Sequence, residues 1–84
     1  MVRKIFKRDK GICVYCGAPA QEVDHVIPVM DGGRPISSNL VCVCRHCNCA
    51  KNYQIFRDEQ WLTTAIFHLL NNHEDTDWMD EYYK

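Results

Sequence analysis

The residues best suited to chemistry are Asp24 and His25, which stand side by side between two C-x-x-C pairs. A carboxylate is a hard oxygen ligand that suits Mg²⁺ or Mn²⁺. A histidine titrates near neutral pH and can accept a proton from water. An Asp-His pair alone in a strand is more often structural, but its position between the cysteine pairs favours chemistry. We therefore interpret this stretch as a hydrolytic site in a zinc-stapled scaffold.

The cysteine pairs predict a closed, four-thiolate zinc site, which is structural rather than catalytic. Buried cysteines or a redox pair are the alternative. Cys42 and Cys49 flank the second pair and could each replace a ligand. Cys42 alternates with Val41 and Val43, which favours a small buried core residue. The two pairs of equal spacing favour these four ligands: Cys13, Cys16, Cys44 and Cys47.

The length of 84 residues predicts one domain with a small core, which needs a staple such as a metal. No apolar run approaches the roughly 18 residues of a membrane span. The basic start, residues 1–8, is not followed by the apolar region of a signal peptide. We expect a cytoplasmic protein with no membrane partner, in which thiols stay reduced.

The net charge of −1 hides a strong asymmetry. Residues 1–57 hold nine Lys/Arg against four Asp/Glu, a net charge of +5, whereas residues 58–84 hold one against seven, a net charge of −6. A basic body suits a polyanion such as nucleic acid, although ordinary solvated faces could give the same counts.

The elements that must position the site follow from the pattern of apolar and turn residues. We expect a helix over residues 2–8 ended by Gly11 in the left-handed conformation, strands over 21–27 and 40–43, and a loop over 30–35. A short helix should start within the second cysteine pair and continue through residue 52. Adjacent strand residues point to opposite faces, so Asp24 and His25 can share a site only if the strand bends or ends there. Pro28 favours such an end.

An apolar stripe predicts a further helix from Asp58, its N-cap, to about residue 70, packed on the scaffold. His68 on this helix and His73 at its end are expected to be structural or surface residues. The acidic tail, residues 74–84, could form a short extra helix, bind a partner or be partly disordered.

The chain resembles the HNH endonucleases over about residues 3 to 53. The motifs that carry the resemblance are Cys13-x-x-Cys16, Asp24-His25-x-x-Pro28, Asp31-Gly32-Gly33, Ser38-Asn39-Leu40 and Cys44-x-x-Cys47-Asn48-x-x-Lys51. The resemblance implies an α+β fold, a small zinc-stapled ββα-metal domain of treble-clef-like form with a C-terminal helix. Residues 1–57 would form the nuclease domain, and residues 58–84 would pack on it or extend it.

The resemblance also implies residue roles. His25 would be the general base that activates water, and Asp24 would hold the catalytic cation. Asn39, the middle letter of the motif, would hold the loop by hydrogen bonds and so orient His25. Asn48 stands where the last histidine of the motif often lies, an HNN variant, and would be the second metal ligand. Lys51 would lie near the scissile phosphate, unless it is merely a solvated lysine.

The asparagine is a departure from the family pattern. Its amide oxygen suits a hard cation, so we expect Mg²⁺ or Mn²⁺ to be preferred over softer metals. His46 is a rival ligand two positions earlier, but on a helix it would lie on a different face from Asn48.

The expected function is metal-dependent cleavage or nicking of double-stranded DNA. Sequence preference would have to come from loop residues such as Arg34 and Arg45, from a second copy of the chain, or from a larger phage or bacterial partner. Two alternatives stay open: a zinc-stapled nucleic-acid-binding adaptor without catalysis, and a nuclease acting on RNA or single strands.

Overall fold

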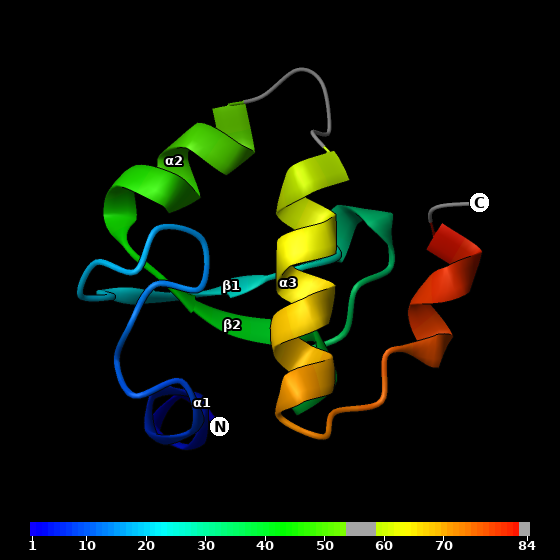
Figure 1. Cartoon of the computed structure of the whole chain (residues 1–84). Helices are drawn as coiled ribbons and strands as arrows, with labels where there is room; N and C mark the ends of the chain where they lie inside the picture. Colours follow the sequence, from blue (N-terminus) through cyan, green and yellow to red (C-terminus); the bar gives the residue numbers. More distant parts are fainter. Residues whose placement is uncertain (54–58, 83–84) are drawn as a thin grey trace.

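A two-stranded antiparallel hairpin lies at the centre of the protein, with helices packed around it (Figure 1). The computed structural model describes residues 1–53 and 59–82. Strand β1 (Glu22–His25) pairs with strand β2 (Leu40–Val43), with Asp24 opposite Val41 and His25 opposite Leu40. This register fixes which side chains share a face, because directly opposed residues of a pair project to the same side of the sheet.

Within the described residues, three helices surround the hairpin: α1 (Val2–Arg8), α2 (Arg45–Tyr53) and α3 (Glu59–Asn71). Three 3₁₀ turns complete the elements: η1 (Val29–Asp31) and η2 (Ser37–Asn39) between the strands, and η3 (Asp77–Tyr82) after α3. None of the described helices is long and apolar enough to cross a membrane. The expected α+β class and the order of strand, loop, strand and helix are confirmed.

Each face of β2 packs against a different part of the chain. Leu40 and Cys42 project toward α1 and form a small buried cluster with Ile5. Val41 and Val43 project to the other face, into the larger core completed by side chains of α3 and η3. Cys42 is 0% exposed, as expected of a core residue, and burial followed by the nearby charge of Asp9 raises the pKa of its thiol to about 11.

Strand β1 is shorter than the expected 21–27. The assigned pairing of β1 ends at His25, although the Val26 N–H still donates to the Asn39 carbonyl at 2.8 Å, and the Val26 and Ile27 side chains enter the large core. The end of α1 also differs in detail, because Lys10 as well as Gly11 takes a positive φ. The expected N-cap, Asp58, lies outside the described residues.

The segment after α3 is part of the core. Met79 is 0% exposed and packs in the same cluster as Val41, and Thr76 is also buried. The Trp78 indole N–H donates a hydrogen bond of 2.8 Å to the hydroxyl of Ser38 in η2. Among the three alternatives for the tail, the short extra helix is the one observed: η3 (Asp77–Tyr82) packs on the scaffold through Trp78 and Met79. The division at residues 57 and 58 falls in the undescribed segment and stays a prediction.

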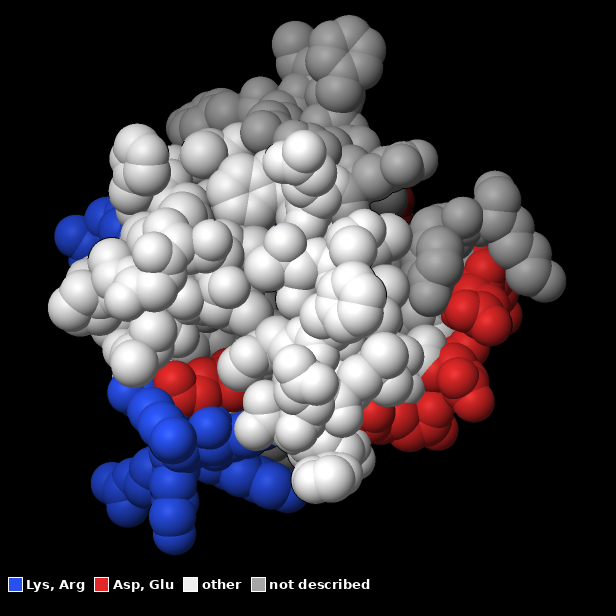
Figure 2. Space-filling model, in the orientation of Figure 1, with Lys and Arg blue, Asp and Glu red and all other residues white. Residues whose placement is uncertain are grey.

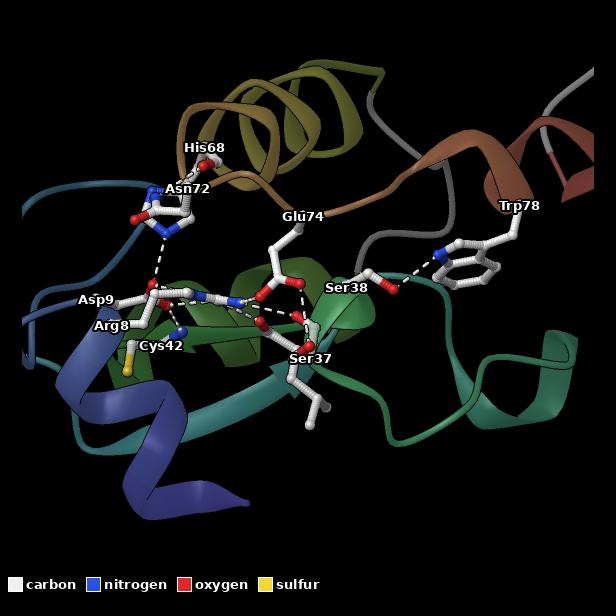
Figure 3. A network of polar contacts seen from close by, with 10 residues as sticks. Arg8, Asp9, Ser37, Ser38, Cys42, His68, Asn72, Glu74 and Trp78 are labelled. Carbon is white, nitrogen blue, oxygen red and sulfur yellow. Dashed lines mark hydrogen bonds and ion pairs between the residues drawn. The ribbon is translucent and has the colours of Figure 1, made fainter.

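A buried polar network joins α1, η2, β2 and the start of the tail (Figure 3). We call it the anchor network, and its ionisable side chains are those of Arg8, Asp9, His68 and Glu74. The Arg8 guanidinium donates to both carboxylate oxygens of Asp9, at 2.6 and 3.0 Å, and to Glu74 at 3.0 Å. It also donates to the carbonyls of Ser37 and Leu40, at 2.8 and 2.5 Å.

The Asp9 carboxylate is the centre of the anchor network. It has further contacts with the His68 ring at 2.7 Å and with the Cys42 backbone N–H at 2.9 Å, and its side chain is 0% exposed. Burial alone would raise its pKa, but the hydrogen bonds from His68, Arg8 and Cys42 outweigh burial and lower it well below the usual range. His68 is therefore a structural residue, as expected.

Candidate active site

Four sulfurs gather where the loop after α1 meets the start of α2. The Sγ atoms of Cys13, Cys16, Cys44 and Cys47 all lie within 4.8 Å of one another. Cys16 is exposed and the other three are buried. The set fits tetrahedral zinc, which favours four thiolates in closed structural sites. The cluster is the one that the C-x-x-C spacing predicts.

Local backbone geometry shapes this cluster. In the first pair, Gly17 takes a φ of +81°, and its N–H donates to the Cys13 carbonyl at 3.0 Å. In the second, the Cys44 sulfur accepts from the Cys47 N–H at 3.3 Å, in the first turn of α2. Burial disfavours the Cys13 thiolate, but backbone hydrogen bonds from Cys44, Cys16 and Tyr15 outweigh it and lower the pKa to about 7. Cys13 is thus prepared to ionise, as a zinc ligand must.

Asn39 holds the segment that follows β1. Its amide is fully buried; the oxygen accepts from the Ile27 N–H at 2.8 Å, and the nitrogen donates to the Ile27 and Arg34 carbonyls at 3.1 and 2.9 Å. These bonds take the place of ladder pairing just beyond His25. Asn39 therefore touches the loop backbone, as a positioning residue would; its effect on His25 stays a prediction.

Gly33 allows the loop to close on the same segment. A Cβ at this position would lie 1.7 Å from the Ile27 carbonyl oxygen. The Gly33 N–H donates to the Pro28 carbonyl at 2.9 Å. Only glycine permits this approach. The Asp31-Gly32-Gly33 motif thus has a steric reason in this chain.

Charged and amide side chains of β1 and α2 meet on one face of the hairpin. We call this group the site cluster: Glu22, Asp24, Asn48 and Lys51. The Lys51 ammonium lies 2.6 Å from Asp24 Oδ2 and donates to the His25 carbonyl at 2.9 Å. The Asn48 amide nitrogen lies 3.0 Å from Glu22 Oε1. Both pairs bridge the strand and the helix, so the two elements present two carboxylates, an amide and an ammonium together.

Glu22 is the member that the sequence analysis missed. It lies two residues before Asp24, so strand periodicity places both carboxylates on the same face. Once residues 21–27 were read as a strand, this spacing could have found it. The pair of carboxylates, rather than Asp24 alone, faces α2.

His25 projects to the other face of β1, on the side of Leu40. Its ring is half-buried and has no hydrogen-bond partner within residues 1–53 and 59–82. Because β1 ends at this residue, His25 stands at the edge of the sheet beside Asp24. Both residues still lie within the paired strand and project to opposite faces, so their joint use in one site stays a prediction.

The other expected residues lie around the cluster. Arg34 in the loop and Arg45 at the start of α2 are exposed, as is the rival ligand His46. The Lys51 ammonium is paired, not solvated, so the alternative of a solvated lysine is wrong for this structure.

Tyr15, within the first cysteine pair, brings an unsatisfied hydroxyl close to the site. Its ring packs edge-on against Trp61, with centroids 4.6 Å apart at 82°. The hydroxyl is buried without a hydrogen-bond partner among the described residues. Burial first, and then the charge of Asp24, raise the pKa of the Tyr15 hydroxyl well above its usual range.

With this geometry in place, the comparisons with known proteins settle the family. The model of the HNH endonuclease family matches residues 13–54, which is half of the chain and includes both cysteine pairs and the whole site cluster. The chain belongs to the HNH endonuclease family. Members of this family are phosphodiester-hydrolysing nucleases, and the resemblance read from the motifs is confirmed.

Two restriction enzymes show the extent of the likeness. This chain aligns with the Type IV methyl-directed restriction enzyme EcoKMcrA of Escherichia coli (strain K12) at 36% identity over an alignment of 59 residues. The alignment covers 58% of this chain and 21% of that protein. The structure of the Type IV phosphorothioation-dependent restriction endonuclease ScoMcrA matches with a TM-score of 0.65 at 21% identity, over 83% of this chain and 16% of that one. The second match shows a shared fold. The chain spans about a fifth or less of either protein.

Proposed function

We propose that this chain is a metal-dependent endonuclease that hydrolyses DNA phosphodiester bonds. The observation that carries the proposal is the pairing of Asp24 with Lys51 and of Glu22 with Asn48, which joins β1 to α2, in a chain that also holds a four-cysteine cluster. In this proposal His25 is the general base, Asp24 and Asn48 hold a catalytic Mg²⁺ or Mn²⁺, and the four cysteines hold a structural zinc.

The donor set fits a hard cation. Asp24 offers a carboxylate, Asn48 an amide oxygen, and Glu22 a second carboxylate within the same cluster. A divalent cation bound there would stabilise negative charge on the phosphate and on the leaving oxygen. The softer metals that prefer imidazole have no histidine within the cluster itself.

In this proposal the protein positions His25 as the general base and restricts its movement through Asn39. The His25 ring stands at the strand end with no described side chain competing for its nitrogens, so it can accept a proton from water. The Asn39 amide fixes the loop after His25 through three hydrogen bonds, and so restricts where the backbone of His25 can lie.

Surface charge supports a polyanionic substrate. Figure 2 shows Lys and Arg side chains gathered over α1, and Asp and Glu side chains over the segment after α3. We propose that α1, α2, Arg34 and Arg45 contact phosphates of double-stranded DNA, a binding mode that weakens as salt rises. The acidic side would face away from the duplex, since it repels phosphate.

Substrate class is inferred from the relatives, both of which are restriction endonucleases by name. We extend from them DNA as the substrate and the bacterial cytoplasm as the place. Their dependence on methylated or phosphorothioated DNA is not extended to this chain, because it matches only a small part of each.

A second candidate is a DNA-binding adaptor without catalysis, and the ion pair of Lys51 with Asp24 favours it. An unpaired carboxylate would repel phosphate, but an ammonium 2.6 Å away neutralises it. In this form the site could receive DNA without a divalent cation.

Plasmid cleavage decides between the two. Supercoiled DNA is incubated with zinc-loaded wild type, His25→Ala or His73→Asn, with and without Mg²⁺ or Mn²⁺. We expect metal-dependent nicking that His25→Ala lowers by at least about 100-fold, the usual effect of losing a general base. His73 is exposed, has a φ of +61° that asparagine tolerates, and serves as the matched control. If the folded wild type binds DNA but cuts nothing in either metal, the adaptor is correct.

A further inference from the structure

Lys51 forms an ion pair with the Asp24 carboxylate, which the proposed function assigns as a metal ligand. Its ammonium lies 2.6 Å from Asp24 Oδ2, with the two side chains only 13% and 12% exposed. A second bond of 2.9 Å to the His25 carbonyl fixes the ammonium beside the strand end. A solvent-screened surface pair would be more exposed and would lack the backbone contact.

The charges of the site cluster are balanced only when two further ligands are present. With both acids ionised, Glu22, Asp24 and Lys51 sum to one negative charge. A divalent cation changes this to one positive charge, and one phosphodiester group then brings the sum to zero. The cluster is therefore electrostatically complete with a cation and a DNA phosphate together, and incomplete with either alone.

Lys51 and a divalent cation cannot both use Asp24 without cost. A hard cation binds a carboxylate oxygen at about 2.1 Å, and a second positive charge on the same small group repels it strongly where water is scarce. The lysine has a flexible stem of four methylene groups, so its head can leave Asp24 while α2 stays in place. Lys51 lies one helical turn after Asn48, on the same face of α2, and its head thus remains near the site.

We infer that Lys51 is an internal cation that holds Asp24 in the metal-free protein and transfers its ammonium from Asp24 to a DNA phosphate when the metal binds. The inference rests on the proposed function, because it takes Asp24 as the metal ligand. It makes Lys51 a positioning residue before the metal arrives and a phosphate-binding residue afterwards.

Two consequences follow from this exchange. Metal binding to the free protein is weakened, because the cation must displace the ammonium. DNA and metal strengthen each other's binding, because a phosphate gives the displaced ammonium a new partner, and such coupling is reciprocal.

Mn²⁺ binding measured by electron paramagnetic resonance tests the exchange without any cleavage. In the zinc-loaded protein, Lys51→Met keeps most of the apolar stem and removes the charge. We expect Lys51→Met to bind Mn²⁺ about tenfold more tightly than wild type in the absence of DNA. Lys7→Met, which removes an exposed charge on α1, is the matched control and should leave Mn²⁺ affinity unchanged. Lys51→Gln provides the same measurement if the methionine variant does not fold.

A short DNA duplex provides the second measurement, in the His25→Ala background. DNA should tighten Mn²⁺ binding about tenfold with Lys51 present, and clearly less with Lys51→Met. Equal tightening in both would overturn the transfer to phosphate.

Asp24→Asn separates this inference from the proposed function. If Asp24→Asn abolishes Mn²⁺ binding but Lys51→Met leaves the affinity unchanged or weaker, the exchange is wrong and the metal site stands. If Asp24→Asn changes nothing in either Lys51 form, the cation does not use Asp24, and both ideas fall.

Discussion

Two charged groups flank the same hairpin, and they are built differently. In the anchor network, the Asp9 carboxylate has contacts from Arg8, the His68 ring and a backbone N–H, and it is fully buried. In the site cluster, Asp24 meets one flexible ammonium and keeps some exposure to solvent. The first group is saturated by rigid partners, and the second is held by a partner that can leave.

The difference separates a group that stabilises the fold from one that is available to ligands. A buried charge with several rigid donors is costly to disturb. In the site cluster, the two carboxylates of Glu22 and Asp24 share one lysine, so a bound ligand is needed to neutralise the charge. The groups are also linked, since Arg8 binds the carbonyls of Ser37 and Leu40, on either side of Asn39. The anchor network thus supports Asn39, which holds the segment after β1.

Equivalent substitutions in the two groups should have unequal effects on stability. We expect Asp9→Asn to lower the free energy of unfolding by about 3 kcal/mol, because it removes the buried carboxylate that Arg8 and His68 contact and leaves Arg8 with Glu74 as its remaining counter-charge. Asp24→Asn should stay within about 1 kcal/mol of wild type, because Lys51 can swing into water and the repulsion from Glu22 is relieved. Urea unfolding of the zinc-loaded proteins at pH 7 measures both.

Zinc content measured before each experiment provides the control. A similar loss in both variants would mean that Asp24 is as structural as Asp9, and would remove the contrast between the two groups.

Acid should affect the anchor network in a defined direction. The pKa of Asp9 is lowered in the folded state, so its contribution to stability is complete above the unfolded value of about 3.9 and is lost as pH falls through the folded value. Arg8 and His68 contact this carboxylate directly, and Glu74 pairs with the same Arg8 guanidinium.

The measurement is the difference in unfolding free energy between wild type and Asp9→Asn along a pH series. It should persist from pH 7 to about 5 and narrow below about 4. Zinc release acts on both proteins, so the difference isolates Asp9. A difference that widens as pH falls below 4 would contradict the assigned direction.

Sequence reasoning reached the features that are local or motif-based. The cysteine ligands, α1, β2, α2 and the buried position of Cys42 all follow from spacing and periodicity within short stretches. The anchor network had no such signal, since Arg8 and Glu74 are separated by 66 positions and neither belongs to a motif.

The sequence also predicted only those residues of the candidate site that belong to a motif. The motif identifies Asp24, Asn48 and Lys51 as site residues, but only the packing of α2 on β1 shows that Lys51 pairs with Asp24. Burial of Met79 could not be read from the tail either, because an acidic segment with scattered apolar residues is equally typical of an exposed one.

Tyr15 gives the smallest expected effect and tests whether every polar atom near the site has a structural purpose. Its hydroxyl has no hydrogen-bond partner among the described residues, in contrast to Asp9 and Arg8. Tyr15→Phe keeps the edge-on contact with Trp61 and removes a buried, unsatisfied group, so we expect the unfolding free energy to rise by up to about 1 kcal/mol. Tyr15→Leu is the matched control, because it loses the ring contact with Trp61. Its unfolding free energy should be lower than that of wild type, by about 0.5–1.5 kcal/mol from the lost contact alone. If Tyr15→Phe instead destabilises the zinc-loaded protein by more than 1 kcal/mol, the hydroxyl has a partner in solution, and the region beside Asp24 is as saturated as the anchor network.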